Sequence, residues 1–185
     1  MGEQHKKHNR REHLNDFHLN VAGEYVYDGA LYACQNDDAK QRRSKRAVWG
    51  MAAILTVAVA AGGCIPAPGM QNCFYVLLPY LGEFLGAASV IWALAKLGMD
   101  WGTVREYNYK KSVAVLPVRT AVTAVFSLLG IVCELIFFFV NDHAGQTFFA
   151  LLYVLLKLTA LLSVLVLRAE IMQAEWDKLP KKNNF

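Results

Sequence analysis

The chain lacks the short motifs that bring catalytic or cofactor chemistry. Its cysteines form no Cys-x-x-Cys pair, its histidines never stand at the His-x-x-x-His spacing, and no glycine-rich phosphate loop is present. The adjacent pair Asp142 and His143 lies in a short loop, where an ordinary polar turn is the better interpretation. These absences favour a protein that is not an enzyme, and the sequence predicts no metal and no cofactor.

Charge is also missing from long stretches of the sequence. Hydrophobic residues make up 55% of the chain, and they gather in continuous blocks instead of amphipathic patterns. Each block approaches the ~20 residues that an α-helix needs to cross a hydrocarbon layer about 30 Å thick. The sequence therefore predicts an all-α integral membrane protein whose four-transmembrane-helix bundle occupies residues 47–168. Its spans are expected at about 47–65, 74–97, 120–140 and 147–167.

The loops 66–72 and 141–146 contain no lysine or arginine, whereas the other polar segments are basic. Basic loops resist translocation, so both termini, in residues 1–46 and 169–185, are expected in the cytoplasm. No signal-peptide pattern precedes the first block, which is expected to remain as an anchor. Without Asn-x-Ser/Thr acceptors, a bacterial cytoplasmic membrane is the expected location. The net charge of +4 is then explained by anionic lipid at the cytoplasmic face, with no role for nucleic acid.

The N-terminal segment 1–46 begins with a polar, histidine-containing tail, which we interpret as solvated and not as a metal site. The stretch "GEYVYDGALYAC" follows, with Asp28-Gly29 as a turn signal between two aromatic runs, and it predicts a β-hairpin. A lone hairpin is marginal in water, so Tyr25, Tyr27 and Tyr32 are expected to rest on another surface. Two interpretations stay open: a docking element for a partner, or an interfacial segment leading into the first span.

Three charged residues interrupt the apolar blocks: Glu83 in the second, Glu134 in the third and Lys157 in the fourth. Counted from the helix ends at 1.5 Å per residue, they fall in one layer of the bundle. A charged side chain facing lipid costs at least ~2.5–3.5 kcal/mol. We therefore expect all three to turn inward, with Lys157 paired to one or both carboxylates.

Small residues near these charges indicate close helix packing. The Gly82-x-x-x-Gly86 pattern permits close approach of a neighbouring helix, and Ser127 and Gly130 recur at helical spacing before Glu134. A proline one turn before Glu83 favours a kink. The residues expected to shape the bundle centre are Pro79, Gly82, Gly86, Ser127 and Gly130.

Cys64 and Cys73 bracket the loop "CIPAPGMQNC" at the predicted outer face, where thiols are oxidised. The spacing allows a disulfide that closes the hairpin of the first two spans. The alternative is a pair of buried thiols at helix ends. One widely spaced pair does not indicate redox catalysis.

Two functions follow from the charge layer. In the preferred one, the charges fix helix packing or contact a partner, and the chain is an interaction or accessory subunit of a larger membrane assembly. In the alternative, Glu83 and Glu134 bind the coupling ion of a small oligomeric proton- or cation-coupled transporter or channel. The expected partner is another membrane protein or a second copy of the chain.

Overall fold

The computed structural model describes residues 17–19, 23, 25–27, 29–98, 101–141 and 147–179. Residues 1–16 of the histidine-containing tail, Asp28, the Asp142–His143 pair and residues 180–185 lie outside the described residues. Four long helices dominate the described part, and each is long and apolar enough to cross a membrane. The predicted helical membrane bundle is confirmed at this level. The long helices are α2 (Asp38–Cys64), α4 (Phe74–Leu97), α6 (Leu116–Val140) and α7 (Thr147–Met172).

The helix bounds differ from the predicted spans mainly at the ends that carry basic residues. Helix α4 has the predicted bounds, whereas α2 already begins at Asp38. The added turns of α2 read "DAKQRRSKR", a run of good helix formers without glycine or proline. The hydrophobic blocks therefore mark where a helix can meet lipid, and helix propensity extends it beyond that region.

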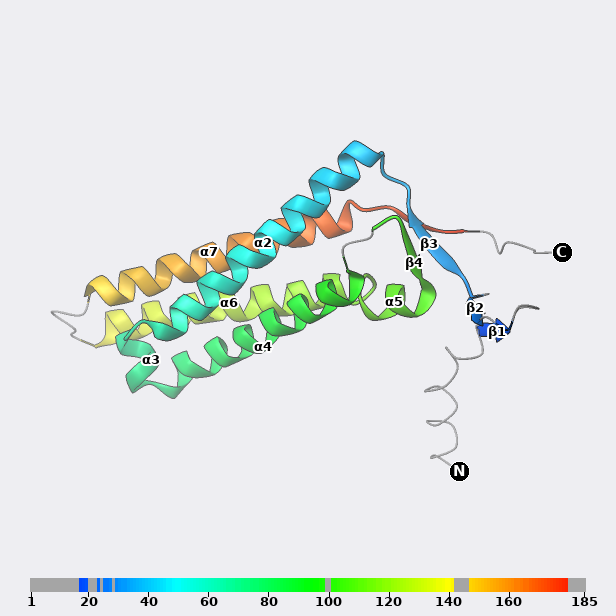
Figure 1. Ribbon diagram of the computed structural model, residues 1–185. Coiled ribbons are helices and arrows are strands. Elements are labelled where there is room, and N and C mark those ends of the chain that lie inside the picture. Colours follow the sequence, from blue (N-terminus) through cyan, green and yellow to red (C-terminus); the bar gives the residue numbers. More distant parts are fainter. Residues whose placement is uncertain are drawn as a thin grey trace, which may run out of the picture.

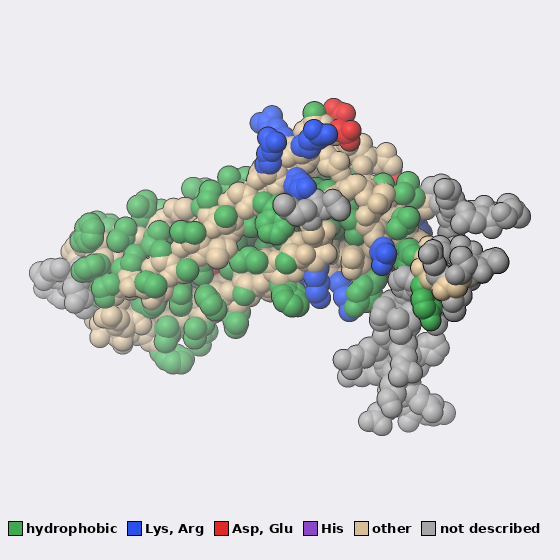
Figure 2. Space-filling model, viewed as in Figure 1, with side chains coloured by type: hydrophobic (Ala, Val, Ile, Leu, Met, Phe, Trp, Pro, Cys, Tyr) green, Lys and Arg blue, Asp and Glu red, His purple; other side chains and the backbone are tan. Residues whose placement is uncertain are grey.

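The long helices close into a ring in which α2 contacts α7, α7 contacts α6, α6 contacts α4, and α4 contacts α2 (Figure 1). The short helix α3 (Pro68–Asn72) connects α2 to α4 at one end of the bundle and contacts α4, α6 and α7. The opposite end carries the strands and helix α5 (Glu106–Lys111). Hydrophobic side chains cover the length of the bundle, and lysine and arginine gather toward the strand end (Figure 2).

A three-stranded antiparallel sheet covers the strand end of the bundle. Its central strand β3 (Leu31–Cys34) pairs with β4 (Thr103–Arg105) on one edge and with β5 (Trp176–Lys178) on the other. This sheet joins the N-terminal segment, the connection between α4 and α6, and the C-terminal segment.

The pairing of the first strands differs from the predicted hairpin. Strand β2 (Tyr25–Tyr27) pairs with β1 (Phe17–Leu19), and not with β3 across the Asp28-Gly29 turn. Both edges of β3 are already occupied by β4 and β5. A two-stranded hairpin is marginal on its own, whereas a three-stranded sheet against helices buries an apolar face. This favours the pairing of β3 with β4 and β5 over a hairpin with β2.

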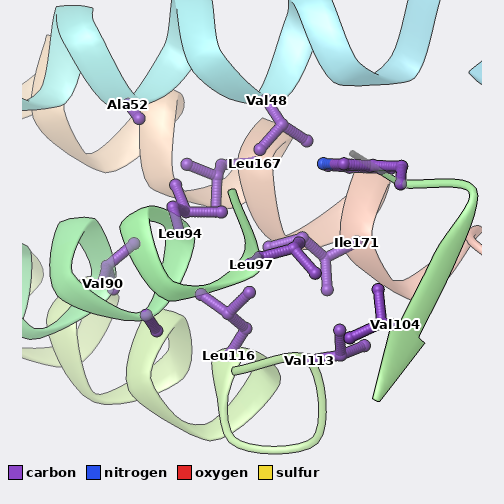
Figure 3. Packing of buried hydrophobic residues seen from close by; sticks show 12 residues of the cluster. Val48, Ala52, Val90, Leu94, Leu97, Val104, Val113, Leu116, Leu167 and Ile171 are labelled. Carbon is purple, nitrogen blue, oxygen red and sulfur yellow. The ribbon is translucent and has the colours of Figure 1, made fainter. Parts of the chain in front are cut away.

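The largest hydrophobic core lies under this sheet (Figure 3). Side chains from all four long helices meet there, and Trp101 and Val104 from the connection between α4 and α6 pack among them. The ring of Tyr32 stacks on Tyr109 with centroids 4.1 Å apart, and Trp176 packs against the same core. Strands β3, β4 and β5 and helix α5 therefore form a cap fixed to the strand end of the bundle. The core residues include Val48, Leu94, Leu97, Leu116, Leu167 and Ile171.

Candidate functional site

The centre of the bundle contains an ion pair between helices α4 and α7. The ammonium of Lys157 donates to Oε2 of Glu83, and both side chains are buried. The hydroxyl of Ser127 on α6 donates to the other oxygen, Oε1, at 2.6 Å. One carboxylate thus connects three helices.

Helical periodicity places these residues at the centre. On α6 the predicted polar face is buried along its length, and on α7 Tyr153 and Ala160 are buried one turn on either side of Lys157. Residues three or four apart share a helix face, so burying one member of each series turns the others inward. The buried polar face of α6 consists of Thr120, Thr123, Ser127, Gly130 and Glu134.

Two aromatic rings enclose the Lys157 ammonium. Its nitrogen lies 4.6 Å from the ring centroid of Tyr80 and 5.2 Å from that of Tyr153, within the range of cation–π attraction. On the α6 side, a Cβ added at Gly130 would lie 3.6 Å from Nζ, an ordinary contact. The ammonium is therefore surrounded by one carboxylate, two rings and a glycine.

Tyr80 also connects this centre to α2, a role that the sequence analysis missed. Its hydroxyl donates to the carbonyl of Val59 at 3.3 Å. A Cβ at Gly63 would lie 2.0 Å from the tyrosine oxygen, so glycine makes room for the ring. The sequence feature that could have indicated this contact is the position of Tyr80, three residues before Glu83 on the same helix face.

The Gly82 and Gly86 pair lies where α4 approaches α6. A Cβ at Gly86 would stand 2.6 Å from Oγ1 and 3.3 Å from Cα of Thr123. A Cβ at Gly82 would stand 2.5 Å from the ring of Phe126. Both glycines therefore permit close contact between the helices, and α4 continues as a helix through the buried Pro79.

Glu134, the third predicted charge, is fully buried but stands apart from the ion pair. Neither of its carboxylate oxygens accepts a hydrogen bond from any described residue. The carboxyl lies against Gly69 of α3, so closely that a Cβ there would overlap Oε2. The backbone N–H of Gly69 approaches the carboxyl, but this contact does not reach hydrogen-bond geometry. The structure therefore brings Glu83 and Lys157 together and leaves Glu134 beside the end covered by α3.

The two cysteines at the ends of α3 are not bonded. Cys64 is exposed at the end of α2, Cys73 is half-buried before α4, and both are free thiols. The residues between them fold into α3, which contacts α4, α6 and α7. The loop is closed by packing.

The three tyrosines considered for docking lie in different surroundings. Tyr25 is 74% exposed on β2. Tyr27 is half-buried, donates to the carbonyl of Ala30 at 3.3 Å, and has the guanidinium of Arg105 5.1 Å from its ring centroid. Tyr32 is stacked within the cap. Of the three, Tyr25 offers the largest exposed surface.

The fold and this buried centre define a small multi-pass helical membrane protein. No protein-family model, no curated protein and no solved structure matches the chain. Within the described ranges, no group of three or more His, Cys, Asp or Glu side chains is placed to hold a metal ion. The function is therefore argued from the geometry of the site.

Proposed function

We propose that the chain is an interaction or accessory subunit of a larger membrane assembly, located in a bacterial cytoplasmic membrane. The observation that carries this proposal is the closure of the Glu83 carboxylate, whose two oxygens are engaged by Lys157 and Ser127 inside the bundle. A carboxylate whose two oxygens are both engaged inside the bundle fixes one helix arrangement. A binding partner would therefore contact other surfaces of the chain.

A buried ion pair is effective in specifying an arrangement. Removing one partner of such a pair costs ~3–5 kcal/mol because the other charge stays buried and uncompensated. Rotating α4, α6 or α7 away from its present face would break the contacts at Glu83 and turn a polar group toward lipid. The pair therefore favours a single, rigid bundle, as a scaffolding subunit requires.

The charge distribution supports a topology with both termini in the cytoplasm. Exposed Arg42, Arg43 and Arg46 lie in the first turns of α2, whereas residues 65–73 around α3 contain no lysine or arginine. Figure 2 shows the basic side chains at the strand end of the bundle. The positive-inside rule then assigns the strand end to the cytoplasm and α3 to the outside.

Two arginines near the strand end of the bundle donate hydrogen bonds to backbone carbonyls of the long helices. Arg119 donates to the carbonyl of Ser89 at 2.7 Å, and Arg168 donates to the carbonyl of Pro117. Long basic side chains at helix ends keep their charged groups at the interface in this way. These contacts support a membrane boundary near the first turns of α6.

The cytoplasmic cap supplies the proposed contact surfaces. Tyr25 is exposed beside it, and a pocket at the start of α2 combines acidic and basic groups. Its arginines suit anionic lipid headgroups, and Tyr25 suits a protein partner, since tyrosine is enriched at protein interfaces. The pocket is lined by Asp37, Asp38, Ala39, Arg42, Arg43 and Arg46.

The proposal is tested by purifying the full chain from its native membrane in a mild detergent and identifying co-eluting proteins by mass spectrometry. A stoichiometric second membrane protein is expected. Tyr25→Ala should release it, whereas Tyr75→Ala, which alters an exposed tyrosine at the α3 end, should retain it. Recovery of the chain alone, as a monomer or homo-oligomer, would contradict the subunit role.

One observation favours the second candidate, a small oligomeric proton- or cation-coupled transporter or channel. Glu134 is a buried carboxyl without a hydrogen-bond partner among the described residues, and such groups are frequent in ion pathways. In proteoliposomes, a transporter would lose ion flux on Glu134→Gln or Glu83→Gln. Equal background flux in the wild type and both variants would count against it.

A further inference from the structure

We propose that Glu134 is a proton-binding site: it carries a proton as a neutral carboxylic acid while α3 covers it, and it releases that proton when α3 lifts. The ligand of Glu134 is thus a proton, and the element that moves is α3. It goes beyond the subunit role and does not depend on it. It also gives the transporter alternative a specific ion and site, and its tests below need neither a partner nor ion flux.

The carboxyl of Glu134 is buried without a partner in the described part of the chain. Glu134 has no exposed surface, and both of its oxygens lack a hydrogen-bond partner among the described residues. An ionised carboxylate without partners in apolar surroundings is so costly that such a group takes up a proton instead. Gly69, the residue against its Oε2, brings no charged side chain.

The nearest positive charge, that of Lys157, is already paired with Glu83. Lys157 donates to Glu83, so this pair is neutral as a unit. The ammonium packs against Gly130, which lies one helical turn before Glu134 on α6. Ionised Glu134 would leave this buried centre with one uncompensated negative charge, and a bound proton removes it.

The remaining titratable groups around Glu134 leave this balance unchanged. Among the described residues, and besides Lys157, they are Tyr153 from α7, Tyr75 from α4 and Cys133 from α6 itself, with Cys73 next to Tyr75. Tyrosine and cysteine side chains have no cationic form, so none of the four supplies a counter-charge to Glu134. The hydroxyl of Tyr153 is itself buried without a partner. Helix α3 contributes no titratable side chain, since its sequence is PGMQN.

Helix α3 covers the Glu134 carboxyl. Ala67, Pro68 and Gly69 are buried against the bundle, and α3 contacts α4, α6 and α7. Glycine at position 69 lets the backbone descend onto the carboxyl, because any Cβ would overlap Oε2. Because α3 is only five residues long, it can open at a lower free-energy cost than any of the long helices.

The direction of the pH effect follows from this cover. Covered Glu134 has no access to water, so the docked position of α3 is compatible with the neutral acid. Ionisation transfers the proton from a carboxyl oxygen to water, and the resulting carboxylate needs hydration. Raising the pH therefore undocks α3, and lowering the pH returns the proton and docks it again.

The proton itself is detected by infrared spectroscopy of the full chain in lipid nanodiscs at neutral pH. The carbonyl stretch of a protonated carboxylic acid is expected in the wild type, and it should be absent from Glu134→Gln. Glutamine preserves the shape and neutrality of the acid, so this variant is expected to fold. An unchanged acid band in Glu134→Gln would overturn the proposal. So would a band of ionised Glu134 that shifts when Na⁺ replaces K⁺, because it would assign a cation.

The movement of α3 is followed at Cys73, which is half-buried at its end. The variant background carries Cys34→Ser, Cys64→Ser and Cys133→Ser, and a membrane-impermeant maleimide labels the remaining thiol. The labelling rate is divided by that of the same chain with Glu134→Gln at each pH, which removes the titration of the thiol itself. The ratio should stay near one at low pH and then rise by up to ~tenfold per pH unit once Glu134 ionises.

Gly69→Ala serves as the positive control for undocking, because the added Cβ would occupy the position of Oε2. It should raise Cys73 labelling at every pH. A ratio that stays at one across the whole pH range, while Gly69→Ala still raises labelling, would overturn the coupling between the proton and α3. Loss of a co-purifying partner or of ion flux would leave both readouts unaffected, so failures of the different proposals are distinguishable.

Discussion

The hydroxyl of Ser127 lies 2.6 Å from Oε1 of Glu83, and this contact joins α6 to α4 at the point where Lys157 joins α7 to α4. Each helix contributes one polar group to the same carboxylate. Because consecutive residues on a helix are about 100° apart, a one-residue rotation of any of these helices would break its contact. The carboxylate therefore specifies the rotation of three helices at once.

Removing either partner of the ion pair should destabilise the bundle. Glu83→Gln and Lys157→Met should each lower the free energy of unfolding by ~3–5 kcal/mol, because the remaining charge is buried without its partner. The double variant should recover much of that loss. Unfolding by sodium dodecyl sulfate in mixed micelles measures the cycle, and simple additivity of the two changes would contradict direct coupling.

Ser127→Ala should have a smaller effect, because it removes one hydrogen bond and leaves the ion pair. Interhelical hydrogen bonds in membrane bundles contribute on average ~0.6 kcal/mol, and at most about 1.7. Ser163→Ala is the matched control: this serine is buried too, but it donates to the carbonyl of Thr159 on its own helix. The same unfolding assay should separate the two, and equal losses would argue against an interhelical role for Ser127.

Gly86→Ala should force α4 and α6 apart. Its Cβ would meet both the side chain and the backbone of Thr123, and overpacking of this kind typically costs ~1–3 kcal/mol. Gly50→Ala on α2 is the control, because a Cβ there meets open space and alanine favours the helix. The expected pattern is a lower unfolding free energy for position 86 and an unchanged or higher one for position 50. Equal stability of the two variants would contradict close packing at Gly86.

Tyr32→Ala should loosen the cap without unfolding the bundle. The stacked pair with Tyr109 is worth ~0.5–1.5 kcal/mol beyond its buried area, so amides of β3 should exchange with solvent about threefold to tenfold faster. Tyr25→Ala, at an exposed position, should leave their exchange unchanged. Hydrogen-exchange mass spectrometry of the full chain in micelles measures both. Unchanged protection in Tyr32→Ala would show that the stack does not hold the sheet.

The sequence predicted the long helices because lipid imposes a length and a composition on each span. It also predicted which faces turn inward, since Ser127, Gly130 and Glu134 repeat at helical spacing and are all buried. Depth counting placed Glu83 and Glu134 in one layer, but it gave no rotation about the helix axes. The choice of Glu83 as the partner of Lys157 therefore depended on tertiary packing.

The cap and the packing of α3 on Glu134 could not be predicted from helical spacing. Strands β4 and β5 are three residues each, too short for an alternating pattern to stand out, and they pair with β3 from distant parts of the chain. The local Asp28-Gly29 signal favoured a neighbouring partner instead. The contact between Gly69 and Glu134 depends on how a loop packs on a bundle end, which no local pattern records.

The order of synthesis gives the sheet a further property. Strand β3 leaves the ribosome before any of the long helices, β4 follows the second, and β5 follows the last. The edge of β3 that pairs with β4 can close after the second long helix, but the edge that pairs with β5 must wait until the final helix has entered the membrane. Closure of the sheet thus reports that insertion of the whole bundle is complete, and a chain arrested before Trp176 would present an open strand edge to the quality-control machinery of the cell.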